Sequence, residues 1–160
     1  MKILYVMRHA KSSWDYPELA DYDRPLNKRG QRDAPRMAVW LSKQNNLPEI
    51  IISSGANRAL TLAKIVQEEL NCKLEVNDDL YGPGTNELLR IIKNFDNDYD
   101  KIMIVGHNPE LTAFINLYGS MNLLNLPTSG IVRIRFDVDR WGAIRHGNTD
   151  LHMWPKCLHE

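Results

Sequence analysis

The chain has 160 residues, of which 43% are hydrophobic and 25% charged, a balance typical of a globular domain. Lys plus Arg and Asp plus Glu number 20 each, so the chain lacks the basic excess of nucleic-acid-binding proteins. No apolar run approaches the roughly 20 residues that span a bilayer, and the N-terminal run stops at Arg8. We therefore expect a cytoplasmic protein without membrane or nucleic-acid partners, in which Cys72 and Cys157 are free thiols.

Short apolar runs alternate with amphipathic segments along the chain. Buried strands are predicted at residues 2–7, 49–53 and 101–105, and a short strand at 73–76. A strand at 129–136, antiparallel or near an edge, and a short one around 143–146 follow. Helices are predicted from Lys28 (capped by Asn27), over 56–70, after a Thr85 cap, and from Pro109 to about Gly119. This alternation predicts a three-layer α/β/α sandwich with a mostly parallel central sheet, as one domain over residues 1–160.

Four basic side chains follow three of the predicted strands. Arg8 and His9 come directly after the first strand, Arg58 follows the second after a short turn, and His107 follows the fourth. Ligands of open α/β sheets bind at the carboxyl ends of the strands, so we expect these residues to converge. Arginine binds two phosphoryl oxygens with its fork, and a helix predicted to begin after an Asn108 cap adds a positive dipole end. The pattern predicts a phosphate pocket.

The two histidines are expected to have different roles. A nucleophilic histidine must be neutral, and the neighbouring arginines disfavour protonation of His9, which is therefore the predicted nucleophile. His107 is then the electrostatic partner, which donates to a phosphoryl oxygen when it is protonated.

The segments that carry these residues resemble the histidine phosphatase superfamily, the phosphoglycerate-mutase-like group. They are residues 4–10, 53–63 and 105–109, and their order makes the set specific. The short length, the Asp-Arg-Pro-Leu run at 23–26 and the Arg-His-Ala-Lys-Ser start resemble the SixA-type phosphohistidine phosphatases. The resemblance extends from about Met1 to Gly119 and implies a phosphoglycerate-mutase-like fold. It also implies a phosphohistidine intermediate on His9, surrounded by Arg8, Arg58 and His107, with no metal and no organic cofactor.

Two positions depart from the pattern of that superfamily. Ala10 replaces the usual glycine after Arg-His, which we expect to matter little unless the backbone there needs a positive φ. Gly82 stands where mutases and many acid phosphatases of the superfamily carry a glutamate proton donor. Such an acid is worth about 10²–10⁴-fold when an alkoxide leaves, whereas an imidazole leaves with less help. The missing acid favours phosphohistidine over sugar phosphates, with Glu87 as a possible substitute donor.

Further candidates lie around the pocket. Lys11 and Ser12 could contact phosphate, and Arg24 could touch substrate at the rim, although an ion pair that fixes its loop is an equal alternative. Glu87 opens a helix, where a glutamate also has a purely structural reason to be. His146, His152 and His159 fit no zinc-binding spacing and are not expected to be catalytic.

Three functions remain open. The first is a monomeric phosphatase that removes phosphate from phosphohistidine on a protein, such as a phosphotransfer domain or carrier. The second is a phosphatase or mutase for small phosphate esters with the same His9 chemistry. The third is a phosphate-binding module without turnover, against which the complete set of two arginines and two histidines argues.

Overall fold

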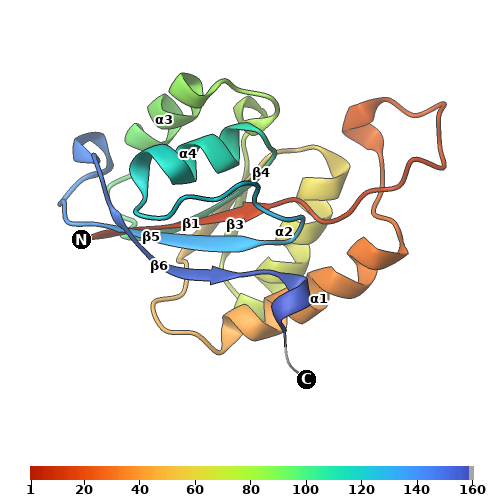
Figure 1. Cartoon of the computed structure of the whole chain (residues 1–160), viewed down its shortest axis with the longest axis horizontal. Helices are drawn as coiled ribbons and strands as arrows, with labels where there is room; N and C mark the ends of the chain where they lie inside the picture. The colour runs from red at the N-terminus through yellow and green to blue at the C-terminus, as the bar shows by residue number, and fades with distance from the viewer. Residues whose placement is uncertain (159–160) are drawn as a thin grey trace.

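The computed structural model describes residues 1–158, so His159 lies outside the description. A six-stranded sheet forms the middle layer, in the order β3-β2-β4-β1-β5-β6 (Figure 1). Its strands are β1 (Lys2–Arg8), β2 (Ile50–Ser53), β3 (Lys73–Val76), β4 (Lys101–Gly106), β5 (Ile131–Phe136) and β6 (Asn148–Met153). The first four strands pair in parallel, and β5 pairs antiparallel with both β1 and β6. The predicted sandwich with a mostly parallel sheet and an antiparallel fifth strand is confirmed.

Two pairs of helices cover the two faces of the sheet. Figure 1 shows α1 (Lys28–Ser42) and α2 (Asn57–Leu70) on one face, and α3 (Thr85–Lys93) and α4 (Glu110–Tyr118) on the other. Successive strand residues point to opposite faces, so Leu4 and Val6 join the core under α3 and α4, while Tyr5 and Met7 join the core under α1 and α2. Strands buried on both faces read as continuous apolar runs, which is why the sequence located them.

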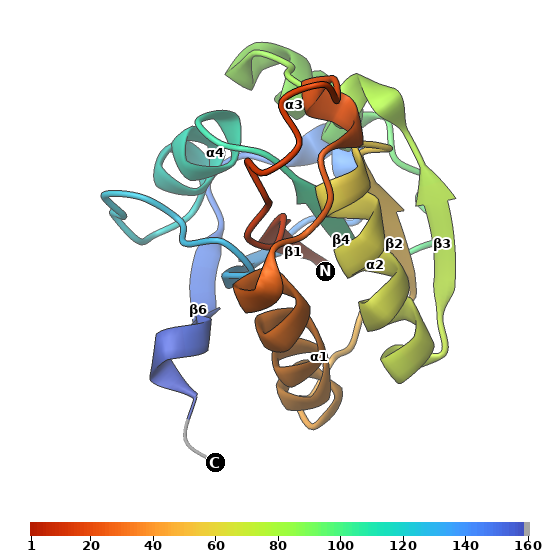
Figure 2. The same ribbon diagram turned by 90° about the vertical axis from the view of Figure 1, so that its right-hand side faces the viewer.

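The carboxyl ends of the parallel strands lie together at one edge, which faces the viewer in Figure 2. The segment between β1 and α1 arches beyond this edge and contains a short 3-10 helix, η1 (Asp21–Asp23). It returns to the sheet where the side chain of Asn27 accepts a 2.9 Å hydrogen bond from the Gly30 amide and caps α1. A Cβ at Gly30 would collide with the backbone of Lys11, so this glycine allows the helix start to pack against the chain that follows His9.

Three predicted boundaries are wrong. The last strand is β6, not residues 143–146. The buried Trp141 instead begins a 3-10 helix, η3 (Trp141–Ala143), and the chain then continues to β6, which pairs with β5. Gly84, not Thr85, takes the cap position of α3. Pro109 takes that position in α4, yet the Asn108 side chain still accepts from the amide of Thr112 at 3.2 Å.

Both cysteines are free, as predicted, and each is half-buried. Within residues 1–158, no helix combines the length and the apolar character that crossing a membrane requires.

Candidate active site

His9 lies at the carboxyl end of β1, and only 9% of it is exposed. Its Nδ1 lies 2.8 Å from the backbone oxygen of Ala10. Because a carbonyl oxygen only accepts, Nδ1 carries the hydrogen, and the lone pair is left on Nε2. Burial lowers the pKa of His9 to about 3, opposed by the bond to Ala10 and assisted by the charges of His107, Arg58 and Arg8. His9 is therefore neutral at pH 7, and burial contributes more to this than the arginines that the sequence argument used.

His107 follows β4, and its ring centroid lies 5.3 Å from that of His9. Its Nε2 lies 2.9 Å from the hydroxyl oxygen of Ser54, which also accepts a hydrogen bond from the Ala56 amide. When this hydroxyl donates to Nε2, the hydrogen of the neutral ring lies on Nδ1, which is buried without a partner in the described structure. Burial, followed by the charge of Arg58, lowers the pKa of His107 to about 4. The ring thus stays neutral until an anion raises its pKa.

Arg8 and Arg58 are each anchored on one side of the guanidinium. Arg8 Nη1 donates to the backbone oxygen of Leu126 at 3.0 Å. Arg58 donates from Nη1 to the backbone oxygen of Asp21 at 2.8 Å and from Nη2 to its carboxylate at 2.9 Å. Burial and the charge of Arg58 lower the pKa of the Arg8 guanidinium. In both arginines Nε is buried and has no partner among the described residues.

The structure thus brings the four predicted residues together and leaves three of their buried donor nitrogens without a partner among the described residues: Nε of Arg8, Nε of Arg58 and Nδ1 of His107. Buried donors without a partner are rare, and they mark a place where a ligand supplies the acceptors. Two guanidinium groups and an imidazole suit a phosphoryl group, which offers several anionic oxygens. Within residues 1–158, no three His, Cys, Asp or Glu side chains cluster in a way that could hold a metal ion.

Asp21 was missed by the sequence analysis. Its carboxylate accepts hydrogen bonds from Arg58, from Arg24 at 3.1 Å and from the Tyr81 hydroxyl at 2.6 Å. The Tyr81 bond is the largest cause that lowers its pKa to about 2, so the group is ionised. The Tyr81 ring also meets the edge of the His107 ring, at 5.4 Å between centroids. The three-residue spacing to Arg24 is the one signal that could have pointed to Asp21.

Ser129, where the fifth strand was predicted to begin, also contacts the segment that contains Arg8 and His9. Its amide donates to the backbone oxygens of Arg8 at 3.1 Å and His9 at 3.0 Å. Its φ is 60°, a conformation that costs about 1 kcal/mol or more for a residue other than glycine. The turn therefore holds the end of β1 in place at some cost in backbone strain.

The lower-ranked candidates lie in different places. Arg24 is buried, donates to Asp21 and Ser12, and stacks 3.6 Å from the ring centroid of Trp14, which matches the loop-fixing alternative. Ser12 accepts that bond at 2.8 Å, while Lys11 is exposed. Glu87 forms an exposed ion pair with Arg90 at 2.8 Å, and no described contact joins it to either histidine.

Both departures from the superfamily pattern have a structural outcome. Ala10 is not among the residues with positive φ, so the alanine is accommodated without strain. Gly82 has a φ of 75°, which favours glycine, and the adjacent Tyr81 is the residue of this loop that reaches His107. No carboxylate therefore comes from the position where the superfamily carries its proton donor.

Comparison with known families finds a match over residues 4–81 to the histidine phosphatase superfamily (branch 1). An uncharacterised chloroplastic protein of Arabidopsis thaliana is 37% identical over 116 residues, which are 66% of this chain and 53% of that protein. The chain thus spans about half the length of this relative. An uncharacterised protein of Mycobacterium tuberculosis is 31% identical over 155 residues, covering 88% of this chain and 93% of the relative.

Solved structures share the whole architecture. A candidate phosphohistidine phosphatase SixA from Agrobacterium tumefaciens has a TM-score of 0.84 at 24% identity, covering 96% of this chain and 98% of the other. A mycobacterial glucosyl-3-phosphoglycerate phosphatase has a TM-score of 0.68 at 15% identity, with 94% and 98% covered. These similarities confirm the predicted phosphoglycerate-mutase-like fold.

Proposed function

The chain belongs to the histidine phosphatase superfamily and is a phosphatase, and from this premise we propose that it removes phosphate from phosphohistidine on a protein through a phosphorylated His9. The observation that carries the proposal is the neutral His9 with a free Nε2, beside three unpartnered nitrogen donors. A binding module would need the donors but not the neutral nucleophile.

The reaction has two steps. First, the Nε2 lone pair of His9 attacks phosphorus, the P–N bond of the substrate breaks, and the substrate imidazole leaves neutral because solvent has protonated its ring. Water then attacks phospho-His9, and inorganic phosphate and neutral His9 are released. Arg8, Arg58 and His107 donate to the equatorial oxygens, on which negative charge is spread in the transition state.

The carboxyl groups of the site support an imidazole leaving group over an alkoxide. Asp21 is ionised and held by Arg58 and Tyr81, so it has no proton to give at pH 7. Glu87 is paired with Arg90 at the surface. Burial raises the pKa of Glu110 in the first turn of α4, but no described contact joins this carboxyl to either histidine. The alkoxide of an ester would therefore have to leave without the help of a general acid, whereas the imidazole of a phosphohistidine would not need it.

A small-molecule phosphate ester is the second candidate substrate. It is favoured by the shared fold with the glucosyl-3-phosphoglycerate phosphatase, whose name states such a substrate. This function requires an acid, for which Glu110 and Glu87 are the residues to test.

The test is phosphate release from a peptide phosphorylated on histidine, measured beside a panel of phosphate esters. The proteins compared are the wild type, His9→Ala, and His146→Ala as a matched control at an exposed histidine. We expect phosphohistidine to be hydrolysed faster than the esters by the wild type and the control, and no turnover by His9→Ala. Faster ester turnover that is lost in Glu110→Gln or Glu87→Gln would establish the second candidate. Phosphate binding without any turnover would contradict both.

A further inference from the structure

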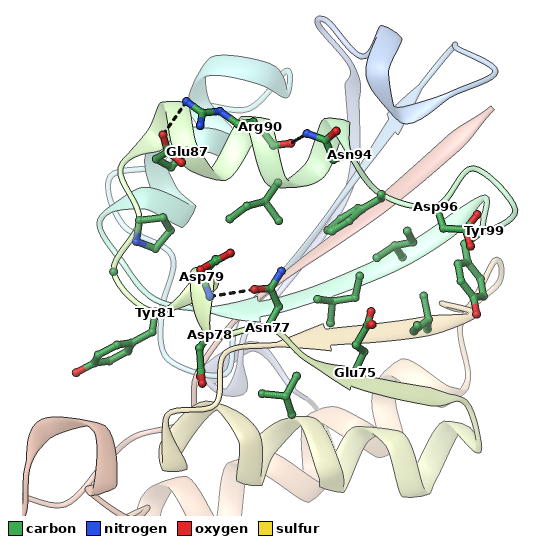
Figure 3. Close-up of a pocket in the computed structure, with 18 residues that line it drawn as sticks. Glu75, Asn77, Asp78, Asp79, Tyr81, Glu87, Arg90, Asn94, Asp96 and Tyr99 are labelled. Carbon is green, nitrogen blue, oxygen red and sulfur yellow. Dashed lines mark hydrogen bonds and ion pairs between the residues drawn. The ribbon is translucent and has the colours of Figure 1, made fainter.

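A groove runs between β3 and α3 on one face of the sheet (Figure 3). It encloses about 760 Å³, and its floor is apolar, with Ile50 and Ile52 of β2, Ile102 of β4 and Phe95 after α3. Parallel sheets are ordinarily covered by helices on both faces. Here α3 buries Leu88 and Ile92 in the core with α4. The groove lies beside α3 along β2 and β3, and at its floor Ile50 and Ile52 are each 6% exposed.

The rim of the groove is acidic. Figure 3 shows Glu75 on β3 and Asp79 in the segment that leads from β3 to α3. Both are exposed, and neither has an ion pair in the described part of the chain. Of the cations nearby, Arg90 is paired with Glu87, and Lys73 donates to the Tyr99 hydroxyl at the far end. Four of the carboxylates that line the groove therefore have no ion pair in the described part of the chain, although the chain as a whole is neutral: Glu75, Asp78, Asp79 and Asp96.

Tyr81 lies between the groove and the phosphate pocket. This residue lines the groove, while its ring contacts the His107 ring and its hydroxyl donates to Asp21. A protein whose phosphohistidine reaches His9 thus brings its neighbouring residues near Tyr81, which also lines the groove.

We propose that this groove docks a segment of the phosphohistidine-bearing protein with apolar side chains on one face and arginine or lysine on the other. The inference rests on the proposed function and adds the class of partner. The apolar side chains cover the isoleucine floor, and the cations lie against Glu75 and Asp79, where opposite charge also speeds the encounter. A phosphorylated metabolite is a poor occupant, because the rim repels its negative charge.

The test uses two peptides with the same apolar residues and one histidine phosphorylated with phosphoramidate. The polar face carries arginine in one peptide and glutamate in the other. The proteins are the wild type, Glu75→Lys/Asp79→Lys, and Glu68→Lys/Glu69→Lys, which makes the same charge change at exposed positions of α2 on the opposite face. Hydrolysis of free phosphoramidate, which is too small to reach the groove, is measured for each.

We expect the wild type and the α2 variant to prefer the arginine peptide by about tenfold in kcat/KM, as two favourable ion pairs allow. The groove variant should lose this preference and hydrolyse phosphoramidate at the wild-type rate. Equal kcat/KM for the two peptides in the wild type, or equal losses in both variants, would overturn the inference while the proposed function stands.

A binding measurement separates the inference from the proposed function. The unphosphorylated peptides, labelled with a fluorophore, are titrated with each protein and followed by anisotropy. If only esters are hydrolysed, the proposed function fails. The docking groove is then supported if the wild type binds the arginine peptide more tightly than the groove variant does, and it is contradicted if the two proteins bind this peptide equally. The neutral variant Glu75→Gln/Asp79→Asn, which should give an intermediate affinity, replaces the lysine variant if that protein does not fold.

Discussion

The protonation state of His9 couples the chemistry of the site to the stability of the fold. Its pKa is lowered to about 3 from the ordinary 6.5, so between these two pH values the unfolded chain binds a proton that the folded protein does not. The free energy of unfolding must therefore rise with pH across this window and level off above it. His107, whose pKa is lowered to about 4, adds to the same rise.

We expect His9→Asn, which lacks the titrating ring, to show a smaller rise in unfolding free energy over that pH range than the wild type. Urea denaturation at a series of pH values measures this difference, and His107 contributes equally to both proteins. Ring-nitrogen NMR of the wild type should in addition find the hydrogen on Nδ1 of His9 at pH 7. An identical pH dependence in the two proteins would mean that folding does not lower the pKa of His9.

Asp21 is expected to act by holding Arg58 in place. Its carboxylate and backbone oxygen together take both terminal nitrogens of Arg58, which leaves Nε for the phosphoryl group. In Asp21→Asn the charged hold on the guanidinium is lost, so kcat should fall about tenfold, since small displacements of catalytic groups cost at least that much. The melting temperature should change little, because Asp21 is half exposed.

Phosphohistidine hydrolysis by Asp21→Asn is compared with Asp15→Asn, a matched change at an exposed residue of the same loop. A rise in kcat/KM in the Asp21 variant would instead mean that the carboxylate competes with the substrate for Arg58.

At the scale of elements, the sequence was sufficient to locate a strand wherever a short apolar run ends in a polar residue. β1, β2 and β4 were located because they are buried on both faces, and the rule for open α/β sheets then placed Arg8, His9 and His107 at one edge. The candidate site could be predicted from the sequence because the order of these elements, and not only the types of side chain, was known.

The features that the sequence did not predict, the role of Asp21 and the position of the last strand, depend on contacts between residues that are distant in the sequence. The contact of Asp21 with Arg58 spans 37 positions, and that with Tyr81 spans 60, so no local pattern carries them. The last strand was displaced because Trp141 packs into the core and donates from its indole nitrogen to the Tyr99 backbone oxygen at 2.9 Å. Periodicity in the sequence does not report such tertiary contacts.

At the scale of the whole molecule, the two ends of β1 carry cations with opposite hydrogen-bonding states, Lys2 fully buried and Arg8 partly buried. Lys2, 1% exposed at the start of the strand, donates to the backbone oxygens of Asn97 at 2.8 Å and Tyr99 at 3.2 Å and pairs with Asp100. Arg8, at the other end, has one bond and a buried Nε without a partner in the described chain. Satisfied polar groups stabilise a fold, whereas unsatisfied ones are retained for function.

This contrast predicts opposite effects of replacing the two cations by methionine. Lys2→Met should lower the unfolding free energy by about 1–3 kcal/mol through the two lost bonds to backbone oxygens, and leave kcat/KM for phosphoramidate unchanged. Arg8→Met should lower kcat/KM about 10²–10³-fold, with no loss of stability, because the Leu126 oxygen still accepts from Asn108 at 3.0 Å. Urea denaturation and phosphoramidate hydrolysis of both variants decide the matter. If Arg8→Met were destabilised as much as Lys2→Met, the unpartnered Nε would not be a cost to the fold, and its reservation for a phosphoryl group would lose its main support.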